Sequence, residues 1–256
     1  MRLQRKQCIY DLSVLLVFGR IYFSHKLAFV ADTPITVNAQ IEKTFEVQKQ
    51  IVPNKENIAQ CSQEPQRLQG MMTQAEITFL KSFIKSDVTY FEWGSGGSTD
   101  TFGRLTSGKI VSVENHQPWC DKVLRLAFVQ CRQKFTSLDY KYIIPYPTRW
   151  LGYPVNKAHN GDFNTYIEVI KDYSNFDIVL VDGRWSVACA LFALDHIKDE
   201  TVLFIHDFGD RPEYHAVFEW CDKVEHVERL VALKRKKGVA RPSTNIIKQY
   251  KMTPRS

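Results

Sequence analysis

Short apolar runs alternate with amphipathic stretches through the middle of this chain. Residues 88–92, 110–113, 140–144, 176–181 and 201–205 are apolar runs that read as strands. Helical spacing lies between and before them, as in 74–85, where Thr73 and Glu76 form a capping box. The run 176–181 is almost continuously apolar, which is typical of a central parallel strand buried on both faces. The alternation predicts an α/β fold, a doubly wound and mostly parallel sheet with helices on both faces.

The first strand ends in a glycine turn. Residues 88–99 read VTYFEWGSGGST, so Gly94, Gly96 and Gly97 separate the strand from a helix that starts with Ser and Thr. Twenty residues after Gly94, the second strand ends in Glu114. Glycines let the backbone approach a ligand, a helix start offers free N–H groups, and a later acid can accept ribose hydroxyls. The segment therefore predicts half of a nucleotide-type site.

The spacing of the glycines distinguishes between two classes of nucleotide-type cofactor. A dinucleotide fingerprint has a third glycine at the sixth position, where this chain has Thr99. The pattern Glu92-x-Gly94-x-Gly96-Gly97 instead resembles motif I of the class I S-adenosylmethionine-dependent methyltransferases. That resemblance implies a seven-stranded Rossmann-like methyltransferase sheet, which would require residues 224–227 and 230–233 to be a closing antiparallel pair. It also implies S-adenosylmethionine as the cofactor, with its methionine ammonium near Glu92.

Carried over residue by residue, the resemblance gives a cofactor site. Its expected members are Glu92, Gly94, Ser95, Gly96, Gly97, Ser98, Thr99, Glu114, Asn115 and Asp182. Two other classes stay open at this stage: an NAD-dependent oxidoreductase, which Thr99 and Glu92 disfavour, and a non-catalytic Rossmann-like binding module.

Polar residues follow the fourth and fifth strands directly. Asp182 ends the fourth, and His206 and Asp207 end the fifth, at the edge where open parallel sheets bind ligands. We expect these three residues to be catalytic, with His206 or Asp182 taking a proton from a substrate oxygen. The alternative to a catalytic role is a purely structural one, in which Asp182 caps the next helix and His206 is a histidine of the core. Relatives that resemble catechol O-methyltransferase bind magnesium here, so Asp182 and Asp207 are candidate ligands of a divalent cation; His-Asp in place of Asp-Asn makes that cation doubtful.

The acceptor has a weaker signature. Arg184, Arg211 and Tyr214 are candidate contacts to an anionic or polyhydroxylated acceptor. Residues 148–162 contain glycine and proline and resemble a lid. We expect methyl transfer to an oxygen of a small-molecule or carbohydrate-like acceptor.

Differences in charge and polarity along the chain divide it into four segments. It has 256 residues and a net charge of +6, but residues 229–256 hold nine Lys or Arg and no acid. We expect a basic and apolar N-terminal segment (1–31), a polar linker (32–70), the methyltransferase domain (71–235) and a basic C-terminal tail (236–256). Tyr250 is the only aromatic residue in this tail, so the tail lacks the set of aromatic side chains on which nucleic-acid bases stack. We therefore interpret the tail as a solvated end and expect no nucleic-acid partner.

The sequence does not decide the cellular compartment of the protein. Residues 1–31 are compatible with a signal peptide, a membrane anchor or an amphipathic helix, so membrane association stays open and the location is cytoplasmic, membrane-anchored or secretory. The six cysteines show no metal spacing. Cys120, Cys131 and Cys189 fall in predicted helices, where we expect buried free thiols.

Overall fold

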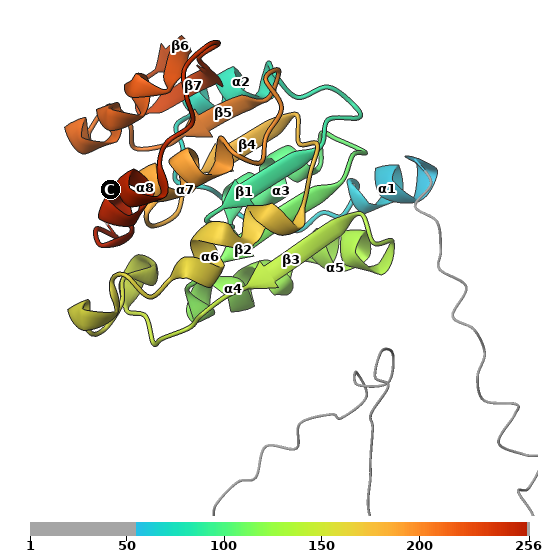
Figure 1. Ribbon diagram of the computed structural model, residues 1–256. Coiled ribbons are helices and arrows are strands. Elements are labelled where there is room, and N and C mark those ends of the chain that lie inside the picture. The colour runs from blue at the N-terminus through green and yellow to red at the C-terminus, as the bar shows by residue number, and fades with distance from the viewer. Residues whose placement is uncertain (1–54, 255–256) are drawn as a thin grey trace, which may run out of the picture. The chain divides into compact units, whose positions relative to one another are not determined.

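The computed structural model describes residues 55–254, and these residues form one seven-stranded sheet with the order β3-β2-β1-β4-β5-β7-β6 (Figure 1). The strands are β1 (Tyr90–Trp93), β2 (Ile110–Glu114), β3 (Leu138–Tyr142), β4 (Ile178–Val181), β5 (Val202–Ile205), β6 (Cys221–Val227) and β7 (Leu230–Arg235). Strands β1 to β5 pair in parallel, whereas β7 pairs antiparallel with β5 and with β6. The predicted closing pair is confirmed, and the sheet is mixed, so the expectation of a mostly parallel sheet holds only for its first five strands.

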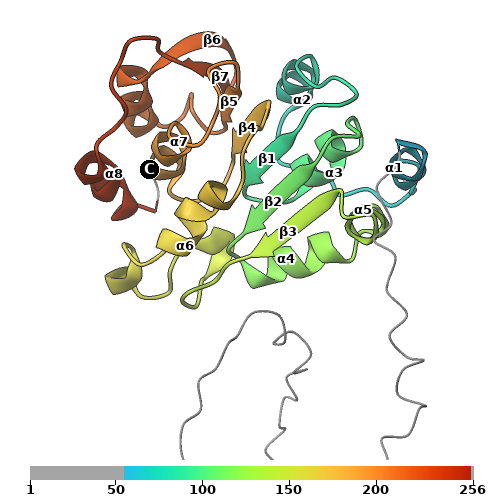
Figure 2. The ribbon, with the colours of Figure 1, turned by 45° about the vertical axis from the view of Figure 1, so that its right-hand side comes forward.

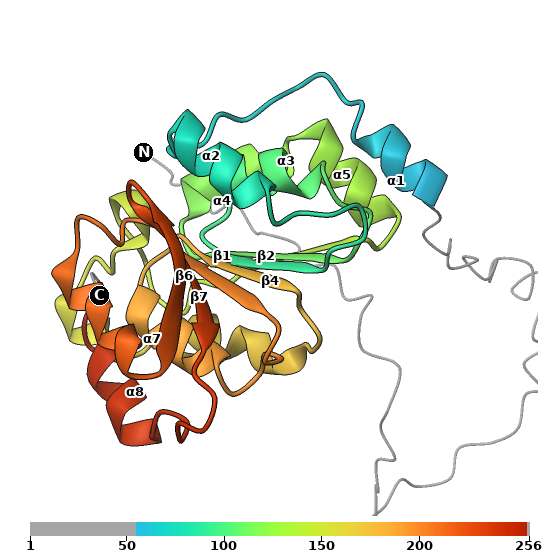
Figure 3. The ribbon, with the colours of Figure 1, turned by 90° about the horizontal axis from the view of Figure 1, so that it is seen from above.

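Helices cover both faces of this sheet (Figure 3). On one side lie α2 (Gln74–Lys81), α3 (Gly97–Gly103), α4 (Gln117–Leu124) and α5 (Ala127–Lys134); on the other lie α6 (Asn164–Ile167), α7 (Ser186–Ala193) and α8 (Thr244–Lys251). Short 3₁₀ helices span Trp150–Gly152 (η2), Lys157–His159 (η3), Glu168–Asp172 (η4) and Pro212–Glu219 (η5).

The two layers follow from the alternation of side chains along each strand. In β4, Val179 and Val181 pack with α6 and α7, whereas Ile178 and Leu180 pack with the helices on the opposite face. Successive side chains of a strand point to opposite faces, so a fully apolar strand fills two cores. This burial fixes the central strands and leaves their carboxyl ends free to carry polar groups.

A disulfide bond attaches α1 (Lys55–Cys61) to the sheet's helical layer. Cys61 is bonded to Cys131 in α5, 70 residues away, and α1 lies beside α5 in Figures 1 and 2. The expectation that Cys131 is a free thiol is therefore wrong, although Cys120 and Cys189 are buried free thiols as predicted. Between β2 and β3 the chain forms two helices, α4 and α5, because it turns between Leu124 and Ala127.

The basic C-terminal segment is folded rather than solvated. Helix α8 packs against α7, and its Ile247 is buried in the same core. Lys251 donates to Glu168 at 2.6 Å, which ties the helix to η4 by a partly buried ion pair. The interpretation of residues 236–256 as a solvated tail is wrong for this helix, because one apolar face of an otherwise basic segment is enough to dock it. The domain boundaries at 70 and 235 stay predictions.

Within residues 55–254, no helix combines the length and apolar character needed to cross a membrane. The alternatives for residues 1–31 (signal peptide, anchor or amphipathic helix) lie outside the described residues.

Candidate active site

A cavity of about 600 Å³ lies at the carboxyl ends of β1, β2, β4 and β5. This volume is in the range of small-molecule sites. Most of the residues predicted from sequence line it: Gly94, Ser95, Gly96, Gly97, Ser98, Glu114, Asn115, Asp182, Arg184, His206, Asp207 and Arg211. Glu92, Thr99 and Tyr214 are not in its wall.

The glycines of the turn after β1 are packed too tightly to be replaced by residues with side chains. Gly94 has φ +85°, and a Cβ there would lie 2.5 Å from the backbone oxygen of Asp182. A Cβ on Gly97 would lie 2.0 Å from the backbone nitrogen of Gly70. The turn is therefore pressed between the end of β4 and the segment before α2, and its own backbone forms the cavity wall.

Glu92 lies beneath this turn instead of in the cavity. It is fully buried and accepts hydrogen bonds from Tyr90 (2.9 Å), Ser112 (2.7 Å) and Thr99. Burial raises the pKa of its carboxyl group, although these donors act against the shift. The same Thr99 hydroxyl accepts from the Gly96 N–H at 2.9 Å. The expectation that Glu92 and Thr99 contact the ligand does not fit this geometry; they support the glycine turn from below.

Glu114 is in the cavity wall and is nearly saturated with donors. Its Oε1 accepts the backbone N–H groups of Asn115 and His116, both at 2.9 Å. Its Oε2 accepts the Ser95 hydroxyl at 3.0 Å, and that hydroxyl lies 2.7 Å from Tyr140. Burial raises the pKa of Glu114 to about 7, against the lowering effect of these donors. The Ser95 backbone N–H also donates to Glu114, so together these donors take up the roughly four acceptor sites of a carboxylate, and a ligand hydroxyl would have to replace one of them.

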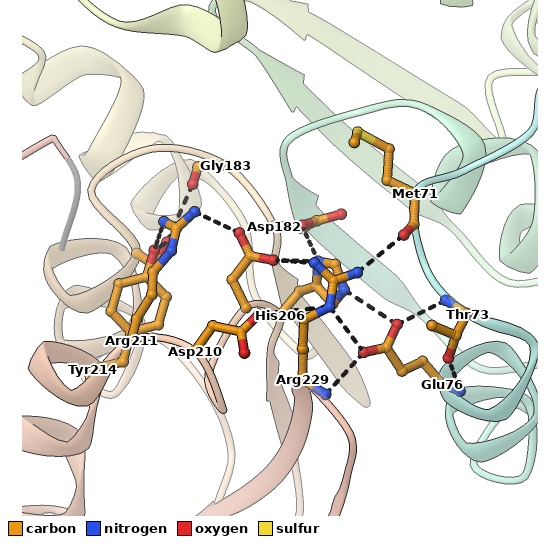
Figure 4. Close-up of polar contacts among 12 residues, drawn as sticks. Met71, Thr73, Glu76, Asp182, Gly183, His206, Asp210, Arg211, Tyr214 and Arg229 are labelled. Atoms are coloured by element: carbon orange, nitrogen blue, oxygen red, sulfur yellow. Dashed lines mark hydrogen bonds and ion pairs between the residues drawn. The ribbon is translucent and has the colours of Figure 1, made fainter.

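A compact charge cluster forms the opposite side of the cavity (Figure 4). Its members are Glu76, Asp182, His206, Asp207, Arg211 and Arg229. They come from α2, the ends of β4 and β5, the loop after β5 and the turn between β6 and β7. The cluster holds three carboxylates and, when His206 is protonated, three cations.

His206 lies between the carboxylates. Its Nδ1 is 2.7 Å from Asp182 Oδ1 and 3.6 Å from Asp207 Oδ1, and its Nε2 is 3.3 Å from Glu76 Oε2. Burial disfavours the charged imidazole, but the charges of these three acids and the hydrogen bond to Asp182 outweigh burial and raise the pKa of His206 to about 9. A pKa of about 9 and a side chain that is only 4% exposed make His206 poorly suited to the role of general base.

Asp182 keeps a position in the cavity wall. Its side chain is 29% exposed, and its pairing with His206 fixes the carboxylate. The following helix α7 has no side-chain cap, so the alternative that Asp182 caps this helix is wrong. Of the two bases predicted from sequence, Asp182 is the more exposed, and the catalytic roles of both stay predictions.

Asp207 is neutralised by two guanidinium groups. Arg211 donates to Oδ2 at 2.6 Å, and Arg229 donates to Oδ1 at 3.0 Å. Among the described residues, no group of three His, Cys, Asp or Glu side chains is placed to hold a metal ion. A divalent cation at Asp182 and Asp207 would have to displace these cations, so the residues do not fit the metal that the resemblance allowed. The buried hydroxyl of Tyr214 holds Arg211 at 2.5 Å, which makes Tyr214 a support rather than a ligand contact.

Several residues in or beside the cavity were not predicted from the sequence, among them Glu76, Arg229 and Trp119. Glu76 was interpreted only as part of the capping box, which is present, yet its carboxylate also accepts the backbone N–H of Arg229 at 2.9 Å. Arg229 lies on the turn between β6 and β7, where no sequence motif predicted a site residue. Trp119 packs on Gly96, and its position just after the acid-ending second strand was the available clue.

Comparison with known proteins identifies the class of fold to which this structure is similar. No family model and no curated protein sequence matches the chain. A solved structure of a methyltransferase-like protein from Silicibacter pomeroyi is 26% identical, with a TM-score of 0.63, and covers 73% of this chain and 98% of its own. The chain therefore has the fold of the class I S-adenosylmethionine-dependent methyltransferases, and the predicted resemblance is confirmed.

More distant solved structures are also similar to it. The O-methyltransferase from Bacillus cereus, in complex with S-adenosylhomocysteine, is 12% identical with a TM-score of 0.42 and covers 77% of this chain and 96% of its own. The O-methyltransferase TomG from Streptomyces achromogenes is 13% identical with a TM-score of 0.43, covering 73% and 92%.

Proposed function

We propose that this protein transfers a methyl group from S-adenosylmethionine to an oxygen of a small-molecule or carbohydrate-like acceptor. One observation carries the proposal. A single cavity is bounded on one side by a glycine turn and a buried acid, and on the other by a fixed, partly exposed carboxylate. The first side suits a nucleoside, and the second suits a hydroxyl that must lose a proton.

The glycine side would hold the cofactor. Gly94, Gly96 and Gly97 offer backbone where no side chain intervenes, and Glu114 would accept a ribose hydroxyl in place of the Ser95 hydroxyl. The Ser95 hydroxyl would then turn from Glu114 to Tyr140, which is already within 2.7 Å. The bound cofactor supplies an electrophilic methyl group on a sulfonium.

Asp182 would accept the proton of the acceptor hydroxyl. His206 holds one oxygen of this carboxylate at 2.7 Å and so fixes its direction, while the cavity positions the hydroxyl. General-base assistance of this kind contributes roughly 10²–10⁴-fold. His206 acts through Asp182 and is therefore a positioning residue.

The disulfide supports a proposal about location. Bonds such as Cys61–Cys131 persist in oxidising compartments and are rare in the cytosol. Of the locations left open by the sequence, this bond favours the secretory one.

Calorimetric titration of the full chain with S-adenosylmethionine, S-adenosylhomocysteine and NAD tests the cofactor. We expect micromolar binding of the first two, weakened at least tenfold by Glu114→Ala and unchanged by Glu225→Ala, a change at an exposed acid on β6. Binding of NAD alone would overturn the proposal in favour of an oxidoreductase. No binding by the folded protein would leave a non-catalytic module. A radiolabelled methyl-transfer screen against sugars and phenols then identifies the acceptor class.

A further inference from the structure

The cations of the cavity wall differ in how they are neutralised. Arg211 and Arg229 share the carboxylate of Asp207, and His206 lies against Asp182. Arg184 also lines the cavity, but no carboxylate of residues 55–254 forms an ion pair with it. Arg184 thus places a positive charge in the wall that no carboxylate of residues 55–254 pairs with, two residues after Asp182.

Arg184 is a buried charge. It is 7% exposed, and its guanidinium donates to the Tyr153 hydroxyl at 2.6 Å and lies 4.6 Å from the centre of that ring. A hydroxyl and an aromatic face orient a guanidinium but do not neutralise it. Buried charges in proteins are ordinarily paired, because removing an ion from water is costly. The missing counter-charge is therefore expected from whatever fills the cavity.

We propose that Arg184 forms an oxyanion subsite, and that the acceptor carries a carboxylate, sulfate or phosphate group near the hydroxyl that is methylated. This inference rests on the proposed function and names the acceptor class within it. The planar guanidinium fork matches such groups in a bidentate manner. Arg211 is unsuited to the same task, because Asp207 and Tyr214 already hold it.

The methionine carboxylate of the cofactor is the competing source of negative charge. The contacts of Arg184 favour the acceptor. Its hydroxyl partner, Tyr153, belongs to the predicted lid 148–162 rather than to the glycine turn. The same lid contributes Trp150, 74% exposed, to the cavity wall. Arg184 is thus oriented by the segment 148–162, which is also bonded to Asn115 through Thr148 and Gly152, so the experiment with a loaded cavity decides between the two sources.

Thermal unfolding in 100 mM sulfate, against chloride of equal ionic strength, tests the subsite. The full chain is compared with Arg184→Gln and with Arg149→Gln, a control because Arg149 also lies over the Tyr153 ring but is exposed and outside the cavity wall. For a Kd of about 10 mM, specific binding raises Tm by roughly 3–6 °C beyond the general effect of sulfate. We expect this extra shift in the wild type and in Arg149→Gln, and its loss in Arg184→Gln. An equal shift in all three proteins overturns the proposal.

The two sources of charge are separated by repeating the measurement with the cavity loaded. With saturating S-adenosylhomocysteine, the extra sulfate shift persists if Arg184 serves the acceptor. Its loss with S-adenosylhomocysteine, but not with 5′-methylthioadenosine, which lacks the carboxylate, assigns Arg184 to the cofactor and overturns the proposal. Should Arg184→Gln fail to fold, Arg184→Lys keeps the charge without the fork and is expected to shrink the sulfate shift. Failure of S-adenosylhomocysteine to bind any variant refutes the proposed function and leaves the sulfate comparison readable.

Discussion

Replacing His206 with glutamine is expected to change how stability depends on pH. Burial disfavours the charged imidazole of His206, but the neighbouring acids outweigh it and raise the pKa from 6.5 to about 9, which corresponds to about 3 kcal/mol of folding free energy. Since the folded-state pKa is the higher one, this stabilisation is complete below pH 6.5 and is lost as the pH rises through about 9. The side chain is 4% exposed, so solvent screening reduces the figure little.

Urea unfolding between pH 6 and pH 10 measures this contribution. We expect the wild type to exceed His206→Gln by about 3 kcal/mol more at pH 6 than at pH 10. Burial also raises the pKa of the Cys120 and Cys221 thiols, so both proteins lose stability at high pH, and only the difference between them reports His206. His215→Gln is the control substitution, because that histidine is exposed and lies outside the charge cluster.

A constant gap between the wild type and His206→Gln across this range would refute the reasoning. Should the variant not fold, NMR titration of the His206 imidazole in the wild type gives the answer directly. A midpoint near 9 supports the charge cluster, whereas one below 7 would return His206 to the role of general base and weaken the assignment of Asp182.

Three further substitutions test other parts of the structure. Cys61→Ser should lower the free energy of unfolding by about 4 kcal/mol, from the entropy of a 70-residue loop, and urea unfolding with and without dithiothreitol should show that only the wild type responds to reduction. Gly97→Ala places a Cβ 2.0 Å from the Gly70 nitrogen, so it should destabilise the fold by about 1–3 kcal/mol and weaken S-adenosylhomocysteine binding in calorimetry; unaltered binding would contradict the packed turn. Asp182→Asn should reduce methyl transfer by roughly 10²–10⁴-fold while retaining cofactor binding, and Asp210→Asn, at a 67% exposed acid, should leave turnover near wild type.

The sequence by itself determined the order of strands and helices and the edge of the sheet that carries the site. Apolar periodicity identified each parallel strand, and the glycines before Ser98 identified the turn, because both signals are local. Polar residues such as Glu114 and Asp182 could be assigned to one cavity, since the carboxyl ends of parallel strands share one edge.

Tertiary structure decided what each group can do. Glu92 and Glu114 end neighbouring strands in the same way, yet one is enclosed by three hydroxyls and the other faces the cavity. The protonation of His206 depends in part on Glu76, 130 residues away, and the proposed role of Arg184 depends on the fact that no carboxylate of residues 55–254 forms an ion pair with it. Ionisation and pairing depend on distances between distant segments, and the local pattern of a sequence does not contain those distances.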